Sequence, residues 1–228
     1  MTREEVRGRI EEIGIIPAIR VASPEDALFA AESVASGGIP IVELTLTVPG
    51  AMEVIAHLVK SAPQLVVGAG TVWDAGTARR CLDAGAKFLT STGLDLETVE
   101  FAAREKVVIF PGVMTPAEVM MAWKAGVDFV KVFPCQHLGG AAYIKTLKTP
   151  FPQVPLIASG GVNQQNVAEF IQAGATAVGV GAHLVPKKAI ELRQPRRIHE
   201  LAVRILSTVH EARKQRMAGG APAHPGGR

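Results

Sequence analysis

Cysteine, aromatic side chains and long apolar runs are all scarce in this chain of 228 residues. Two cysteines cannot build the disulfide framework of a small secreted domain, so we expect a reducing, cytoplasmic setting. No apolar run approaches the roughly 18 residues of a membrane-spanning helix, and acidic residues interrupt the N-terminal stretch, which argues against a signal peptide and a membrane partner. The six histidines show no metal-ligand spacing, so we expect no metal and no other cofactor.

Charge is present but unevenly spread. The chain carries a net charge of +3, yet residues 187–228 hold ten basic and three acidic side chains, while the remaining residues are mildly acidic. A basic C-terminal segment leaves nucleic-acid binding as an alternative, although aromatic residues are only 5% of the chain and offer no stacking platform for bases. We therefore expect no nucleic-acid partner. With 48% apolar residues, residues 1–216 are predicted to form one domain and residues 217–228 a disordered tail.

Short β-branched runs alternate with longer amphipathic stretches along the whole chain. Most of the runs lack polar alternation, which is typical of strands buried on both faces of a parallel sheet. The predicted strands are Ile15–Val21, Ile41–Thr47, Leu65–Gly70, Phe88–Ser91, Val107–Val113, Phe129–Pro134, Pro155–Gly161 and Ala177–Val185. Helix starts are indicated by SPED at Ser23, TPAE at Thr115 and NQQN at Asn163.

The predicted helices also end alike. Glycine follows each of four helices and precedes a strand, where it accepts a left-handed C-cap, at Gly37, Gly85, Gly126 and Gly174. Eight strand–helix units of this kind predict an α/β fold, a (β/α)8 TIM barrel with an additional N-terminal helix. A doubly wound open sheet is the competing architecture, but no GxGxxG opens the first unit.

Two charged residues interrupt otherwise apolar strands. Lys131 lies in FVKVFP, where burial disfavours the ammonium form and lowers its pKa. A neutral amine can attack a carbonyl and form a Schiff base; the alternatives are a buried ion pair or a lysine whose head reaches solvent. Glu43 lies in IVELTL and suits acid–base work, unless it only pairs with Lys131 or Arg20. Both would lie at the barrel mouth, which favours chemistry there.

Glycines after the last two predicted strands indicate an anion site. Gly160 and Gly161 end the seventh strand and Gly181 lies in the eighth, where such barrels commonly bind phosphate through backbone N–H groups. Tight turn geometry is the alternative reason for glycine there. Arg20 could hold a carboxylate or phosphate or cap the barrel rim, and Gly70 with Thr71 could present donors to a carboxylate.

Several motifs occur together and in order between residues 15 and 185. They are IVELTLTVPGA, VGAGTV, FPGVMTPAE, FVKVFP, ASGGV and AVGVGAHLV. In this combination the chain resembles the 2-keto-3-deoxy-6-phosphogluconate (KDPG) aldolases, also called 4-hydroxy-2-oxoglutarate (KHG) aldolases. The resemblance implies a class I, metal-independent lyase on a (β/α)8 barrel that is usually a homotrimer.

The resemblance also implies roles for individual residues. Lys131 would be the Schiff-base lysine and Glu43 the acid–base residue. The implied substrate-binding positions are Arg20, Thr47, Gly70, Thr71, Thr92, Phe133, Ser159, Gly160, Gly161, Gly181 and Ala182. Four of these depart from the usual family residue: Thr47 replaces an arginine of many members, Thr92 a proline, Ser159 a threonine and Ala182 a serine.

The expected activity follows from the resemblance. It is cleavage of KDPG, a phosphorylated 2-keto acid, to pyruvate and glyceraldehyde 3-phosphate. A non-phosphorylated 4-hydroxy-2-oxoglutarate or related pyruvate aldol is the alternative substrate, because Ala182 removes a hydroxyl from the phosphate site. A non-catalytic barrel that binds phosphometabolites is the alternative of another class.

Overall fold

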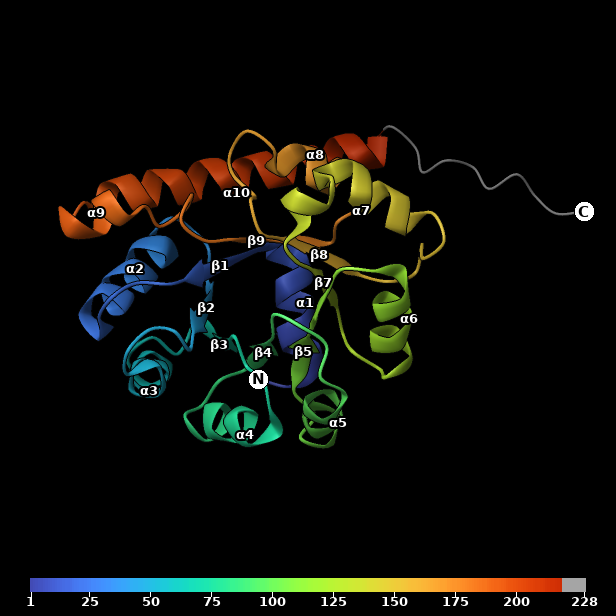
Figure 1. Cartoon of the computed structure of the whole chain (residues 1–228). Coiled ribbons are helices and arrows are strands. Elements are labelled where there is room, and N and C mark those ends of the chain that lie inside the picture. The colour runs from blue at the N-terminus through green and yellow to red at the C-terminus, as the bar shows by residue number, and fades with distance from the viewer. Residues whose placement is uncertain (219–228) are drawn as a thin grey trace, which may run out of the picture.

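The computed structural model of the chain describes residues 1–218, and its helices surround a parallel sheet (Figure 1). The strands are β1 (Ile15–Ile19), β2 (Ile41–Thr45), β3 (Val66–Gly70), β4 (Phe88–Thr90), β5 (Val108–Phe110), β6 (Gly112–Val113), β7 (Val130–Val132), β8 (Leu156–Ser159) and β9 (Ala177–Val180). The helices are α1 (Arg3–Ile13), α2 (Pro24–Ser36), α3 (Ala51–Ser61), α4 (Ala75–Asp83), α5 (Leu96–Arg104), α6 (Pro116–Lys124), α7 (Gly140–Lys148), α8 (Val167–Gln172), α9 (Lys187–Glu191) and α10 (Pro195–Ala218), with a short 3-10 turn at Cys135–Leu138.

The sheet closes into a barrel at Pro111. Every strand pair is parallel, and the order β5-β4-β3-β2-β1-β9-β8-β7-β6 leaves β5 and β6 at the two ends. These two are halves of one predicted strand, which Pro111 interrupts because proline has no N–H to donate to the ladder. The first half pairs with β4 and the second with β7. The predicted eight-stranded (β/α)8 barrel is therefore confirmed, with its fifth strand divided.

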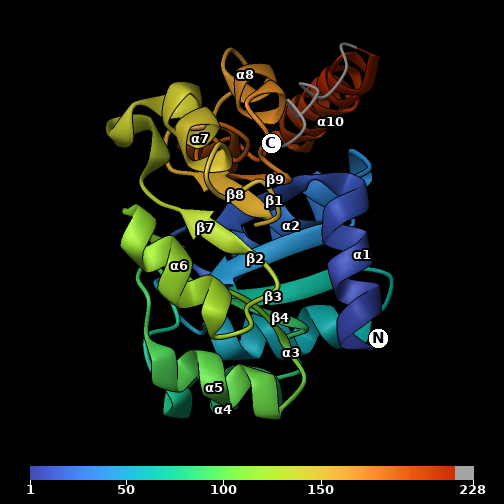
Figure 2. The same ribbon diagram turned by 90° about the vertical axis from the view of Figure 1, so that its right-hand side faces the viewer.

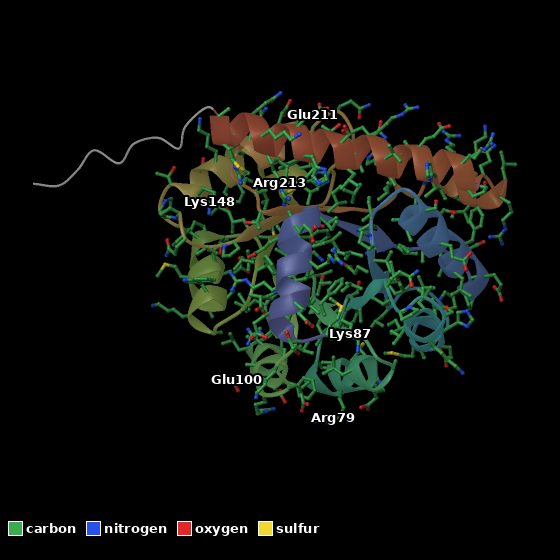
Figure 3. All side chains as sticks on the ribbon, turned by 180° about the vertical axis from the view of Figure 1, so that it is seen from behind. Arg79, Lys87, Glu100, Lys148, Glu211 and Arg213 are labelled. Atoms are coloured by element: carbon green, nitrogen blue, oxygen red, sulfur yellow. The ribbon has the colours of Figure 1, made fainter. Side chains whose placement is uncertain are left out.

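The N-terminal helix covers one end of the barrel. In Figures 2 and 3, α1 lies across the ends of the strands. Arg3 pairs with the buried Asp128, which precedes β7, at 2.9 Å, and Asp128 also accepts a hydrogen bond from the backbone N–H of Ile109 at 3.2 Å. Since Asp128 comes before its strand, α1 closes the N-terminal end and leaves the C-terminal end open.

Aromatic packing fills part of the interior. Phe88, Phe110 and Phe129 are fully buried, with ring centroids 5.4 Å apart in the first pair and 6.0 Å in the second. Gly68 on β3 makes room for them, because a Cβ at that position would lie 2.2 Å from the Phe88 ring. These three aromatic residues thus form a packed cluster inside the barrel.

The long helix α10 packs along α2 and α8, and arginines fasten it to the barrel. Arg213, labelled in Figure 3, donates to the backbone carbonyls of Glu12 at 2.6 Å and Thr176 at 2.7 Å. Arg216 donates to the carbonyl of Ile171 at 2.8 Å. The helix continues through residue 218, so residues 217 and 218, which were predicted to belong to the tail, are helical. The rest of the predicted tail, residues 219–228, lies outside the described part of the chain.

Two of the three helix starts predicted from capping motifs are confirmed. Ser23 and Thr115 cap α2 and α6 with their side chains, whereas the helix predicted near Asn163 begins only at Val167, after a turn in which the Asn163 side chain accepts backbone N–H groups. Within residues 1–218, no helix is both long and apolar enough to cross a membrane.

The left-handed caps are confirmed at Gly85, Gly126 and Gly174. The prediction was wrong at Gly37, whose φ is −82°; the left-handed residue is Gly38. Gly37 is required for another reason, because a Cβ there would lie 2.5 Å from the Cβ of Ala202 on α10. Close helix packing, not backbone conformation, therefore explains this glycine.

Candidate active site

A cavity of about 350 Å³ opens at the C-terminal ends of the strands. Its lining brings together most of the residues predicted from the sequence, namely Arg20, Glu43, Thr71, Thr92, Lys131, Phe133, Ser159, Gly160, Gly161, Gly181 and Ala182, together with Ala18, Val162, Gly179 and His183. A second hollow of about 300 Å³ lies at the opposite end near Lys87 (Figure 3), but no charged side chain that lines it is buried. The chemistry therefore concentrates at the barrel mouth, as the fold predicts.

Lys131 on β7 is buried at the base of this cavity, with 7% of its surface exposed. Burial lowers the pKa of the Lys131 ammonium below its ordinary value, the nearby Glu43 carboxylate opposes this shift, and the positive charge of Arg20 adds to it. The ring of Phe133 lies with its centroid 5.4 Å from Nζ. The site thus favours the uncharged amine that carbonyl attack requires.

The Lys131 amine also has a fixed partner. Its Nζ donates a hydrogen bond to Thr90 Oγ1 at 2.9 Å, and Thr90 is completely buried on β4. Among the described residues 1–218, Nζ makes no second hydrogen bond. Lys131 is therefore neither the partner of a salt bridge there nor a lysine whose head reaches bulk solvent.

Glu43 on β2 is buried to a similar degree, with 5% exposed. Its carboxylate lies directly over Gly70, because a Cβ at Gly70 would be 2.0 Å from Glu43 Oε1. Glu43, Thr90 and Lys131 come from the second, fourth and sixth strands of the barrel. Side chains from alternate strands share one layer of such a barrel, which explains why residues so far apart in sequence meet.

Thr71 follows β3 in an unusual backbone conformation. Its φ is +66°, a left-handed value that is an outlier for a β-branched residue. The next residue, Val72, donates its N–H to the carbonyl of Thr90 at 3.1 Å and so holds the turn against β4. This strained turn places Thr71, with its hydroxyl group, in the wall of the cavity.

The loop after β8 presents backbone to the cavity. Gly160 and Gly161 have φ of +90° and +87°, and Cβ atoms there would lie 2.9 Å from Pro134 Cα and 2.4 Å from Gln136 Cβ. Gly179 on β9 leaves space for Ser159, whose Oγ would be 2.6 Å from an added Cβ. Close approach to neighbouring residues, as well as turn geometry, therefore requires these glycines.

Two predicted residues lie outside the lining. Thr47 is exposed, and its hydroxyl is engaged with Thr45 at 2.8 Å. Gly70 lies beneath the Glu43 carboxylate and, because it has no side chain, leaves room for it.

Sequence reasoning missed Thr90 and His183. Thr90 offered the same signal as Lys131, a polar residue within an apolar strand, but threonine is common in strands. His183 offered no spacing signal, because a single residue after the last strand becomes significant only when the barrel places it at the cavity.

The buried Cys135 lies next to the loop after β8. The pKa of the Cys135 thiol is raised to about 12, mainly because of burial, and its Sγ donates to the Gly160 carbonyl at 3.4 Å. Such a thiol is packed and unreactive.

Among residues 1–218, no three His, Cys, Asp or Glu side chains are grouped so that they could hold a metal ion.

The fold and site together define a (β/α)8 barrel with a buried amine and a buried carboxylate at its mouth. A sequence model of the KDPG and KHG aldolase family matches residues 6–201. The chain therefore belongs to this family, as the sequence motifs predict.

Individual relatives agree with this assignment. The 2-dehydro-3-deoxy-phosphogluconate aldolase of Pseudomonas aeruginosa is 30% identical over 89% of this chain and 92% of its own length. The KHG/KDPG aldolase of Escherichia coli K12 is 30% identical over 82% of this chain and 88% of its own. The KDPG aldolase of Legionella pneumophila, crystallised with pyruvate captured at low pH as a covalent carbinolamine intermediate, has a TM-score of 0.82 at 31% identity, over 88% of this chain and 97% of that one.

Proposed function

We propose that this protein is a class I aldolase that cleaves KDPG to pyruvate and glyceraldehyde 3-phosphate through a Schiff base on Lys131. The observation that carries the proposal is the buried Lys131 amine, with its lowered pKa, in one cavity with the buried Glu43 carboxylate. The names of the relatives support the substrate, and the carbinolamine captured in the Legionella relative supports a covalent amine adduct.

The reaction begins at the ketone. The neutral Lys131 amine attacks the C2 carbonyl carbon of the substrate, and proton transfer from nitrogen to oxygen gives a carbinolamine. A proton from solvent then converts the carbinolamine hydroxyl into a leaving water, and its departure gives the protonated imine. This iminium is a better electron sink than the ketone, because its nitrogen already carries positive charge.

Glu43 accepts and then donates a proton in the following steps. Its carboxylate removes the proton of the C4 hydroxyl, directly or through one water. The C3–C4 bond breaks, its electron pair moves toward the iminium nitrogen, and the aldehyde leaves. Protonated Glu43 returns the proton to C3 of the enamine, and hydrolysis of the imine releases pyruvate and free Lys131.

Anionic groups of the substrate would be held around this pair. Arg20 at the rim supplies positive charge for a carboxylate or phosphate. Thr71 supplies donors near the pyruvyl carboxylate, and Gly160 and Gly161 supply a backbone cradle for the phosphate. Ser159 keeps a hydroxyl close to the middle of the substrate.

Trapping with pyruvate and borohydride tests this function. Hydride reduces the imine to a stable secondary amine, and peptide mapping should place the added mass at Lys131. Lys148 is the internal control, because burial lowers its pKa too but it donates to the carbonyls of Pro152 and Val154, outside the cavity. Absence of an adduct at Lys131 contradicts the Schiff base, and an adduct without pyruvate release from KDPG favours the non-catalytic binding barrel.

A non-phosphorylated pyruvate aldol, such as 4-hydroxy-2-oxoglutarate, is the second candidate substrate. It is favoured by Ala182, which lines the cavity without a hydroxyl to offer a phosphate. Comparing kcat/KM for both substrates decides between them. A preference of about a hundredfold for KDPG, roughly the effect of one hydrogen bond to a charged group, rejects this candidate.

We further propose a cytoplasmic homotrimer. The family resemblance supports the trimer, as does the likeness to a cage protein designed by fusing symmetric oligomeric domains, with a TM-score of 0.83 at 26% identity. Both cysteines are free and buried, which suits a reducing compartment. Sedimentation equilibrium tests the assembly, and a monomeric mass contradicts it.

A further inference from the structure

Thr90 is a fully buried hydroxyl that faces the Lys131 amine from inside the barrel. It ends β4, two barrel strands away from β7, and its Oγ1 accepts the hydrogen bond of Lys131 Nζ at 2.9 Å. Two charged groups also act on the Lys131 amine, namely the Glu43 carboxylate and the Arg20 guanidinium. Thr90 is thus the neutral group that contacts the amine.

The two side chains differ in stiffness. Lysine places its nitrogen at the end of a flexible four-carbon chain, whereas the branched Cβ of threonine restricts χ1. The Thr90 backbone is fixed as well, because it pairs in register with Phe110 on β5 and its carbonyl accepts the N–H of Val72. A rigid acceptor therefore defines where the mobile amine can rest.

We infer that Thr90 is a positioning residue, which holds the Lys131 amine so that its lone pair faces the substrate ketone. The inference rests on the proposed function and deepens it. A neutral amine has two N–H donors and one lone pair. When one N–H donates to Thr90, rotation about the Cε–Nζ bond is restricted, and the lone pair stays available for carbonyl attack.

Thr90 also links the amine to the carboxylate-binding side of the cavity. Its carbonyl accepts the N–H of Val72, directly after the strained Thr71. One residue therefore fixes both the nucleophile and the turn that presents the Thr71 hydroxyl. This arrangement sets the distance between the Lys131 amine and the Thr71 turn that would hold the pyruvyl carboxylate.

The test is Thr90→Val, which keeps the shape and removes the acceptor. We expect kcat to fall about tenfold while KM changes less than about threefold, as for the loss of one hydrogen bond between neutral groups. The rate of reductive trapping with pyruvate should fall in parallel. Thr90→Ser, which restores the hydroxyl, should recover most of both rates.

The pH profile separates positioning from structural damage. A hydroxyl that accepts from nitrogen stabilises the ammonium form, so Thr90→Val should move the acidic limb of kcat/KM to lower pH by about one unit. Loosened packing around Glu43 and Arg20 would instead admit water and move the limb upward, toward the ordinary lysine value. A downward shift with a slower plateau therefore supports positioning alone.

Controls keep each outcome decisive. Thr98→Val makes the same change at a buried threonine on α5, outside the cavity, and should leave kcat unchanged. If Thr90→Val does not fold, Thr90→Ser and Thr90→Ala give the same comparison. An unchanged plateau and limb in Thr90→Val overturn the inference while wild-type trapping at Lys131 still supports the aldolase; absence of wild-type trapping counts against the proposed function itself.

Discussion

Gly70→Ala is the sharpest test of the role of Glu43, because it disturbs the carboxylate without changing it. The added Cβ would lie 2.0 Å from Glu43 Oε1, 2.5 Å from Cδ and 2.7 Å from Cγ. Ordinary contact begins at 3.4 Å, so the carboxylate must retreat by more than 1 Å from its present position. Misplacement of a catalytic group by about 1 Å costs roughly a hundredfold in rate.

We therefore expect kcat for KDPG cleavage to fall about a hundredfold in Gly70→Ala. Pyruvate trapping at Lys131 should fall much less, because the added methyl group does not reach the amine. Overpacking costs about 1–3 kcal/mol of stability, so a thermal unfolding curve must accompany the kinetics.

The matched control is Gly8→Ala on α1, where an added Cβ meets nothing within 4 Å. It should leave kcat unchanged and raise stability by up to about 1 kcal/mol. If Gly70→Ala cleaves KDPG as fast as the wild type, Glu43 is not the proton-transfer group that we propose.

Three further predictions concern charge. Pyruvate trapping should rise with pH through the Lys131 pKa at a midpoint well below 10.5, its ordinary value, and a midpoint at or above that value contradicts the buried neutral amine. Arg20→Gln should raise KM for the anionic substrate, and it should move that midpoint upward, because a positive neighbour that lowers the pKa is lost; an unchanged midpoint separates Arg20 from the amine. Arg213→Met should lower the unfolding free energy by about 1–3 kcal/mol, because two backbone carbonyls lose their donor. The control Arg204→Met, at an exposed position of the same helix, should change the unfolding free energy by less than about 0.5 kcal/mol. Equal effects of the two variants in calorimetry contradict the proposal that Arg213 holds α10 against the barrel.

Local rules were sufficient to predict much of the fold. The apolar runs located all eight barrel strands because strands buried on both faces need apolar side chains throughout. Ser23 and Thr115 were recognisable as caps because their hydrogen bonds are made within one helical turn. Gly37 was misread because its requirement comes from Ala202, more than 160 residues away, which no local pattern encodes.

The candidate site was predictable where the chemistry itself was anomalous. Lys131 and Glu43 could be found because a charge inside an apolar strand is costly and needs a reason. Thr90 carries no charge, and a threonine in a strand is ordinary. Its importance arises only from the register that brings β4 and β7 into one layer, so a three-dimensional structure was needed to find it.

Part of the positive charge near the C-terminus has a structural role, and part of the positive charge at the cavity has a chemical one. Arg213 and Arg216 donate to backbone carbonyls of neighbouring elements, and Arg193 pairs with Asp26 at 2.9 Å. A guanidinium that caps carbonyl groups cannot at the same time contact a phosphate backbone. The cation left at the cavity is Arg20, beside an amine that burial keeps neutral. A local positive charge beside the amine suits a small anionic substrate, because both its charge and its ketone can then be bound in one cavity.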